Sequence, residues 1–141
     1  MWLVYALSAS MLWGLNYSLN ERVFQGKVSP ATLLIFQGLA SAMIALAVGF
    51  PKVGGDLRAL QADRSTLVVA LGALATYGLG NLLISLSIQA KNATLAGLVE
   101  LSYPIFTVLF TWLLFRQVHV TPSVLAGGAL IVAGIVLVSK G

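Results

Sequence analysis

The stretch ATLAGLVELSYPIFTVLFTWLLF, from Ala93 to Phe115, decides the fold class. It contains one charged residue, Glu100, and is otherwise apolar or weakly polar. A helix that crosses the hydrocarbon core of a bilayer needs about 20 mostly apolar residues, and this stretch is long enough. The sequence therefore predicts a membrane-spanning α-helix over residues 93–115.

Comparable apolar stretches occupy most of the remaining sequence on both sides. The predicted spans are residues 2–24, 31–50, 66–89, 93–115 and 123–138. The connections between them are short, apart from a polar loop over residues 51–65 that we expect to be partly helical along Leu57–Ala62. Short connections make consecutive helices antiparallel neighbours. Residues 1–141 are thus expected to form a single domain, an all-α integral membrane bundle of about five transmembrane helices.

Composition excludes several other classes of protein. Hydrophobic residues make up 59% of the chain and charged residues 9%, whereas soluble domains carry about 25% charged residues. The net charge of +4 does not indicate nucleic-acid binding, because the basic residues are scattered between apolar stretches. The chain lacks cysteine, and its single histidine, His119, has no sequence partner for a dyad. We expect no metal site, no cofactor and no enzymatic activity.

Polar and aromatic side chains recur at helical spacing on four of the five spans. Polar groups are costly against lipid, so such faces usually line a bundle interior or a water-filled cavity. Any one of these residues alone is more simply explained as a cross-link between helices, but four faces together favour a cavity. The predicted substrate-binding residues are Trp13, Asn16, Tyr17, Asn20, Gln37, Tyr77, Asn81, Glu100, Tyr103 and Thr107. The fifth span is rich in glycine and alanine and is expected only to pack.

Glu100 is the sharpest functional candidate, because it is the only acidic residue well inside an apolar span. A charge at the bilayer centre costs about 2.5–3.5 kcal/mol on insertion scales, so Glu100 is a candidate for proton coupling. Pro104 lacks the N–H that would bond the carbonyl of Glu100, and a helix kink is expected there. The alternative is a structural carboxyl, either paired with a base of a partner chain or hydrogen-bonded to a neighbouring tyrosine.

The basic residues give no preferred orientation. Five spans would place Lys52, Arg58, Arg64 and Arg116 on one face of the membrane and Arg22, Lys27, Lys91 and Lys140 on the other. Orientation normally follows an excess of Lys and Arg on the cytoplasmic side. A balanced count is compatible with insertion in both orientations and antiparallel pairing, or with one orientation fixed by other features.

Several motifs resemble the EamA-type family of the drug/metabolite transporter superfamily. The segment Tyr5–Asn20 contains ALSASMLWGLN, which is similar to the family's opening helix. The closing region, with PIFT from Pro104, WLLF from Trp112 and GGALIVAG from Gly127, resembles its fourth and fifth helices. The resemblance covers nearly the whole chain. Two positions depart from the family pattern: Gln37 stands where many relatives carry arginine, and Arg116-Gln117 where many carry Gly-Glu.

This resemblance implies a fold and a function. Typical relatives have two five-helix halves in inverted orientation around a central cavity, and this chain resembles a single-repeat form. The expectation is a small secondary transporter or exporter of drugs or metabolites in a bacterial inner (plasma) membrane. Its partners would be the lipid bilayer, a small-molecule substrate and a second copy in a homodimer. The balanced basic residues allow the two copies to be antiparallel. The alternative is a non-transporting half-unit that pairs with another membrane protein.

Overall fold

The computed structural model describes residues 1–117 and 120–139, and this part of the chain is helical without any strand. The helices are α1 (Trp2–Gln25), α2 (Pro30–Ala62), α3 (Arg64–Ala90), α4 (Ala93–Glu100), α5 (Tyr103–Phe115) and α6 (Pro122–Ser139). Three helical stretches are long and apolar enough to cross a membrane: Pro30–Ala62, Arg64–Ala90 and Ala93–Phe115. The expected all-α membrane fold is confirmed. His119 and Lys140, which were considered in the sequence analysis, lie outside the described residues.

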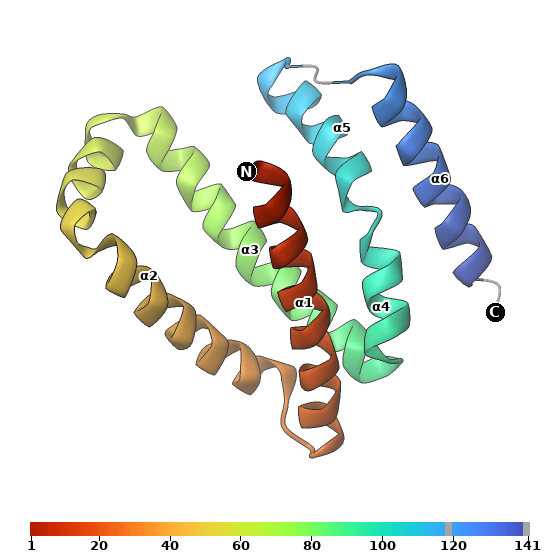
Figure 1. The fold of residues 1–141 in the computed structure, drawn as a ribbon. Coiled ribbons are helices and arrows are strands. Elements are labelled where there is room, and N and C mark those ends of the chain that lie inside the picture. The colour runs from red at the N-terminus through yellow and green to blue at the C-terminus, as the bar shows by residue number, and fades with distance from the viewer. Residues whose placement is uncertain (118–119, 140–141) are drawn as a thin grey trace.

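The helices run back and forth between two ends of the molecule (Figure 1). α1 lies in the middle of the view and packs against α3 and α4, while α2 leans away from it toward α3. α5 continues the direction of α4, and α6 returns beside them. The start of α1 and the end of α6 consequently lie toward opposite ends in this view.

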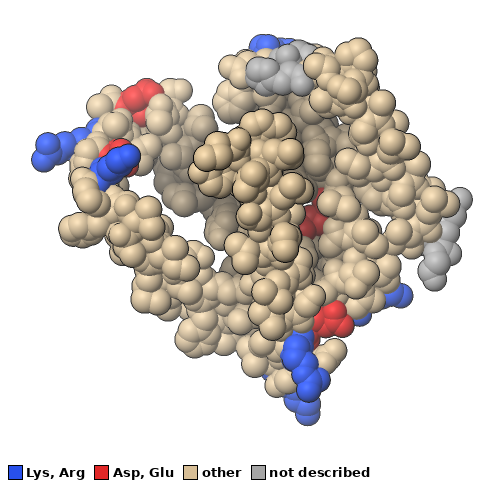
Figure 2. All heavy atoms as spheres, viewed as in Figure 1, with Lys and Arg blue, Asp and Glu red and all other residues tan. Residues whose placement is uncertain are grey.

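The buried core is small and lies at one end of the bundle. It consists of Phe24, Ile88, Ala93 and Ala96, where the last part of α1 meets the end of α3 and the start of α4. We call this region the closed end. Most other large apolar side chains are exposed, which suits helices surrounded by lipid. Figure 2 shows charged side chains gathered toward the ends, with an almost uncharged belt between them.

α2 is longer than its sequence predicts. The apolar span 31–50 was expected to end before a polar loop over residues 51–65, but the helix continues through Pro51 to Ala62. The helix expected over Leu57–Ala62 is confirmed, but the loop prediction was wrong for residues 51–56 and 64–65, which are helical. Pro51 removes one backbone hydrogen bond without ending the helix, and the good helix formers of Leu57–Ala62 sustain its last part. The connection to α3 is reduced to Asp63, whose carboxylate accepts hydrogen bonds from the N–H groups of Ser65 (3.0 Å) and Thr66 (3.1 Å).

The predicted span 93–115 is divided into two helices. α4 ends at Glu100, and Leu101 and Ser102 form a turn before α5 begins at Tyr103. Pro104 lies in the first turn of α5, so the break precedes the proline where a kink was expected. The N–H of Ile105 donates to the carbonyl of Ser102 at 3.0 Å, because helical bonding restarts there.

Arg116 ends α5 in a left-handed backbone conformation, with φ 55° and ψ 24°. This region favours glycine, since a side chain there is strained by its own backbone. In this chain, the Arg116 guanidinium lies 5.7 Å from the centre of the Trp112 ring, where a cation–π contact offsets part of the strain.

Candidate functional site

An open cavity of about 710 Å³ lies between α1, α3, α4 and the start of α5. Six of the ten predicted binding residues line it: Trp13, Tyr17, Tyr77, Asn81, Glu100 and Tyr103. Cavities of roughly 300–1,000 Å³ are typical of small-molecule sites. One side of this cavity is open. Two of its lining residues, Tyr77 and Tyr103, accordingly have exposed fractions of 55% and 61%.

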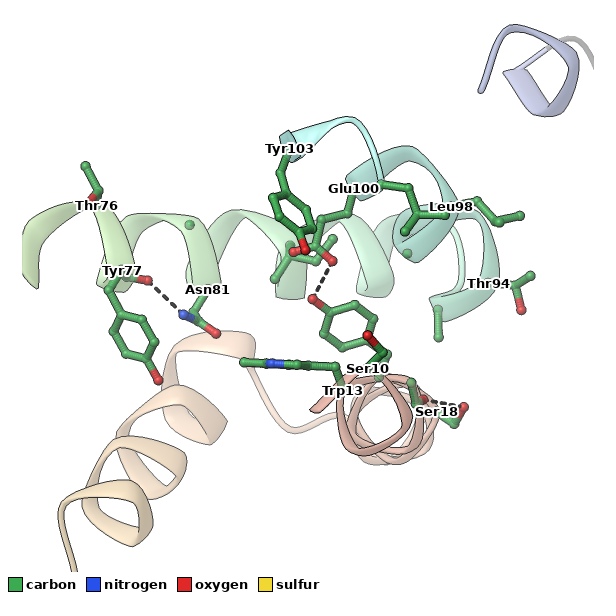
Figure 3. Close-up of a pocket in the computed structure, with 17 residues that line it drawn as sticks. Ser10, Trp13, Ser18, Thr76, Tyr77, Asn81, Thr94, Leu98, Glu100 and Tyr103 are labelled. Atoms are coloured by element: carbon green, nitrogen blue, oxygen red, sulfur yellow. Dashed lines mark hydrogen bonds between the residues drawn. The ribbon is translucent and has the colours of Figure 1, made fainter. Parts of the chain in front are cut away.

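The Tyr17 hydroxyl donates a hydrogen bond to Oε2 of Glu100, which joins α1 to α4 (Figure 3). Gly97, one turn before Glu100, lies against the Tyr17 ring, and a Cβ at this position would be in van der Waals contact with the ring, 3.4 Å from its Cδ2. The lining residues include no Lys or Arg in the described chain. The bond from Tyr17 is the tyrosine contact named among the structural alternatives for Glu100, and pairing with a base of a partner chain stays a prediction.

Aromatic rings form much of the cavity wall. Trp13 and Tyr17 are 5.8 Å apart between ring centres and tilted by 58°. Figure 3 shows Trp13, Tyr77 and Tyr103 around the same space as Glu100. Stacked or tilted rings of this kind present apolar faces that also attract cations.

Asn81 contributes a polar group to the same cavity. Its Nδ2 donates to the carbonyl of Tyr77, four residues earlier in α3, at 2.8 Å. The amide oxygen accepts no hydrogen bond from the described residues. It is available to a ligand donor.

Three predicted binding residues instead form a chain of amides between α1 and α2. Gln37 Nε2 donates to Asn20 Oδ1 at 2.9 Å, and Asn20 Nδ2 donates to Asn16 Oδ1 at 3.0 Å. Asn20 is buried, with 5% of its surface exposed, and none of the three lines the cavity. The structure places them as a cross-link between helices.

Thr107 also lies away from the cavity. Its hydroxyl donates to the carbonyl of Tyr103 at 3.0 Å, one turn earlier in α5. The side chain thereby satisfies its hydrogen-bonding group within its own helix, which a threonine facing lipid must do. Of the predicted residues it contacts the backbone of Tyr103, and it does not line the cavity.

The cavity also includes residues that were not predicted as binding residues. These are Ser10, Gly14, Ser18, Thr76, Gly80, Ile84, Ala93, Thr94, Gly97, Leu98 and Leu101. Ser10 and Gly97 share helix faces with predicted residues, so the periodicity that identified Trp13 and Glu100 could have found them. Thr76 and Thr94 carry no comparable sequence signal, and only the arrangement of helices identifies them.

Comparison with known proteins gives the family. The sequence model of the EamA-like transporter family matches residues 1–140. Comparisons with curated proteins and with solved structures found no significant match. The match extends over all the helices described above and agrees with an open cavity in an apolar bundle. The chain therefore belongs to the EamA-like transporter family, within the drug/metabolite transporter superfamily.

Proposed function

We propose that this protein is a small secondary transporter that carries a small organic cation through the cavity between α1, α3 and α4. The observation that supports this proposal is a single carboxyl group, Glu100, within aromatic walls and without a basic residue among the described lining residues. Family membership supports membrane transport of small molecules rather than catalysis. The proposed location is the plasma membrane, which in bacteria is the inner membrane.

The chemistry of the cavity favours a singly charged substrate with an apolar body. Glu100, when ionised, supplies one negative charge, and a monovalent cation would neutralise it without leaving an unpaired charge in a low-dielectric site. Rings such as Trp13 and Tyr103 would cover the apolar body and add cation–π attraction of about 0.5–2 kcal/mol each. Asn81 would orient a donor group of the substrate through its amide oxygen.

Glu100 is also the proposed coupling residue. If a proton and the cation compete for its carboxylate, export of the cation is linked to proton entry. If Glu100 stays protonated throughout, the protein is a facilitator that follows the substrate gradient. The hydrogen bond that Tyr17 donates to Glu100 fits both mechanisms, because an ionised and a protonated carboxyl each have an oxygen that can accept it.

We further propose that the working unit is a homodimer. The cavity has lining residues on α1, α3, α4 and the first residue of α5, and its remaining side is open. Polar groups such as Asn81 and Glu100 would be costly if that side faced lipid. A second copy, arranged antiparallel, would close the cavity, as the balanced distribution of basic residues allows. Pairing with a different membrane protein is the competing arrangement.

Binding can be tested by thermal unfolding of the purified protein in nanodiscs. A panel of aromatic monovalent cations, together with neutral molecules of the same shape, would be added to the wild type and to Glu100→Gln. A ligand present at 100 times its Kd stabilises the native state by about 2.7 kcal/mol, which is a readily measured shift. We expect stabilisation by cations only, and its loss in Glu100→Gln. Equal shifts in both proteins, or none in either, would refute the cationic substrate.

Transport and assembly need separate measurements. In liposomes, Glu100→Gln is expected to abolish uptake driven by a pH gradient, whereas a facilitator would retain downhill flux. Two lysines added to the connection between Arg116 and Thr121 should bias insertion toward one orientation and reduce transport. Full transport by this biased protein alone would contradict the antiparallel arrangement. A strictly monomeric mass in both detergent and lipid would contradict the dimer.

A further inference from the structure

One hydrogen bond ties α1 directly to the backbone at the start of α4. Oε2 of Glu21 accepts the N–H of Ala93 at 2.7 Å, across 72 residues of sequence. The first N–H groups of a helix have no partner within the helix, and a carboxylate near them is favoured by the helix dipole. Asn92, the N-cap of α4, accepts from Leu95 at 2.8 Å. The start of α4 is thus held by one group of its own and one from α1.

α4 is a short rod whose two ends differ. It has eight residues, and its last residue is Glu100, after which the chain turns at Leu101 and Ser102. Tighter hydrogen bonds replace the α-helical ones at this turn, because the N–H of Ser102 donates to the carbonyl of Val99 at 3.1 Å and that of Ile105 to Ser102 at 3.0 Å. Glu100 lies about 10 Å along the helix axis from Ala93, so the way in which Ala93 is fixed bears on the position of Glu100 relative to Tyr17.

The contact from Glu21 coincides with the closed end of the bundle. Ala93 and Ala96 are buried there, at 8% and 4% exposure, against Phe24 and Ile88. Phe24 lies one turn after Glu21 in the same helix. The closed end therefore contains both the buried apolar cluster and the hydrogen bond between Glu21 and Ala93, which joins α1 to α4.

We infer that Glu21 is a positioning residue of the transport site. Its carboxylate holds the start of α4 against α1, keeps the closed end shut, and thereby fixes the helix that carries Glu100. The role in transport rests on the proposed function of Glu100, but the closure of this end by Glu21 does not. Opening at this end would require the bond between Glu21 and Ala93 to break together with the contacts around Phe24.

The inference can be tested without a substrate, since the native chain has no cysteine. A cysteine placed by Ala96→Cys reports on the closed end, because that position is buried. The rate of its modification by a water-soluble maleimide would be measured in nanodiscs, where both membrane faces are accessible. Modification of a buried site follows the population of the open form. Thr94→Cys, at an exposed position of the cavity, controls for the chemistry of the reagent.

Glu21→Ala is expected to speed modification at position 96 by roughly tenfold or more, since hydrogen bonds to charged groups are among the stronger ones. Glu21→Gln keeps the shape and an acceptor oxygen but not the charge, and should give a smaller increase. Asn92→Ala is the matched control, because it removes a cap of the same helix without touching α1. If Asn92→Ala speeds modification at position 96 as much as Glu21→Ala does, Glu21 acts only as a cap of α4, and the inference that it holds α4 against α1 is wrong. Rates within twofold of wild type in both Glu21 variants would overturn the inference.

Absence of any ligand-induced shift would refute the cationic substrate yet leave these rates unaffected. Unchanged rates beside a clear ligand shift would refute the role of Glu21 alone. The two proposals therefore fail independently.

Discussion

Removal of the Tyr17 hydroxyl is the most direct test of the site at Glu100. Tyr17→Phe keeps the ring that packs beside Gly97 and tilts against Trp13. It removes only the group that donates to Oε2 of Glu100. Any effect therefore reports on the hydrogen bond between α1 and α4 rather than on packing.

The magnitude follows from the kind of bond and its surroundings. A hydrogen bond to a charged group contributes about 1.5–3 kcal/mol net, and one between neutral groups about 0.5–1.5 kcal/mol. The pair is partly buried beside an open cavity, so we expect a value near the point where the two ranges meet. We expect Tyr17→Phe to lower the free energy of unfolding by about 1–2 kcal/mol.

The assay is a double-mutant cycle, with unfolding in mixed detergent micelles followed by circular dichroism. The four proteins are the wild type, Tyr17→Phe, Glu100→Gln and the double variant. If the hydroxyl acts through Glu100, the coupling free energy should approach the effect of Tyr17→Phe alone, because contacting groups are not additive. Tyr77→Phe is the matched control, since Tyr77 lines the same cavity without bonding Glu100 in the described structure.

Additivity of the two substitutions to within about 0.5 kcal/mol would refute the reasoning, because independent sites behave in that way. The same conclusion would follow if Tyr77→Phe destabilised the protein as much as Tyr17→Phe. Either result would mean that the contact between Tyr17 and Glu100 does not form.

Three further predictions concern the frame around the cavity. Asn20→Leu should lower the unfolding free energy by about 1–3 kcal/mol, because it breaks the amide chain between α1 and α2. Ligand affinity should stay within twofold, because Asn20 does not line the cavity. An affinity loss equal to that of Glu100→Gln would contradict this. Lys27→Gly should raise stability by about 0.5–1 kcal/mol, since Lys27 has a φ of 66°, whereas Lys27→Ala should not; thermal unfolding distinguishes them. The hydrogen bond from the Thr66 hydroxyl, followed by those from the N–H groups of Ser65 and Thr66, lowers the pKa of Asp63 below its usual 3.8. The ionised Asp63 therefore stabilises the fold above pH 3.8, and this stabilisation is lost as the pH falls through its lower folded-state pKa. In a plot of unfolding free energy against pH, Asp63→Asn should show a smaller loss of stability on the acid side than the wild type.

The fold class was predictable from hydropathy, whereas the ends of individual helices depended on local bonding. Apolar stretches such as residues 66–89 identify α3 almost to the residue, because nothing but a helix satisfies its backbone within lipid. Residues 51–56 were misjudged because proline, glycine and charges together usually indicate a loop, whereas the helix over residues 57–62 was predicted correctly. The helix through Pro51 loses one backbone hydrogen bond and keeps the others. The sequence alone does not show whether the remaining bonds suffice to continue the helix.

The candidate site was predictable in part for a geometric reason. Trp13, Asn16, Tyr17 and Asn20 lie within a stripe roughly 100° wide on α1, given about 3.6 residues per turn. A stripe of that width contacts more than one neighbouring helix. Its two aromatic residues face α3 and α4, and its two amides face Gln37 on α2. Periodicity identifies the stripe but not which neighbour each residue meets, and Glu21 was overlooked because an acid at a helix end looks unremarkable in sequence.

The length of α2 has a consequence for the surrounding lipid. At about 1.5 Å per residue its 33 residues extend about 50 Å, well beyond the roughly 30 Å of a hydrocarbon layer. The excess is the part after Pro51, which carries Lys52, Asp56 and Arg58 and bends away from the first part of the helix in Figure 1. These side chains belong in the headgroup zone, so the proline fixes how deep the helix sits. A thicker bilayer could therefore be matched by drawing more of this segment inward only until the charged end of Lys52 reaches the acyl chains.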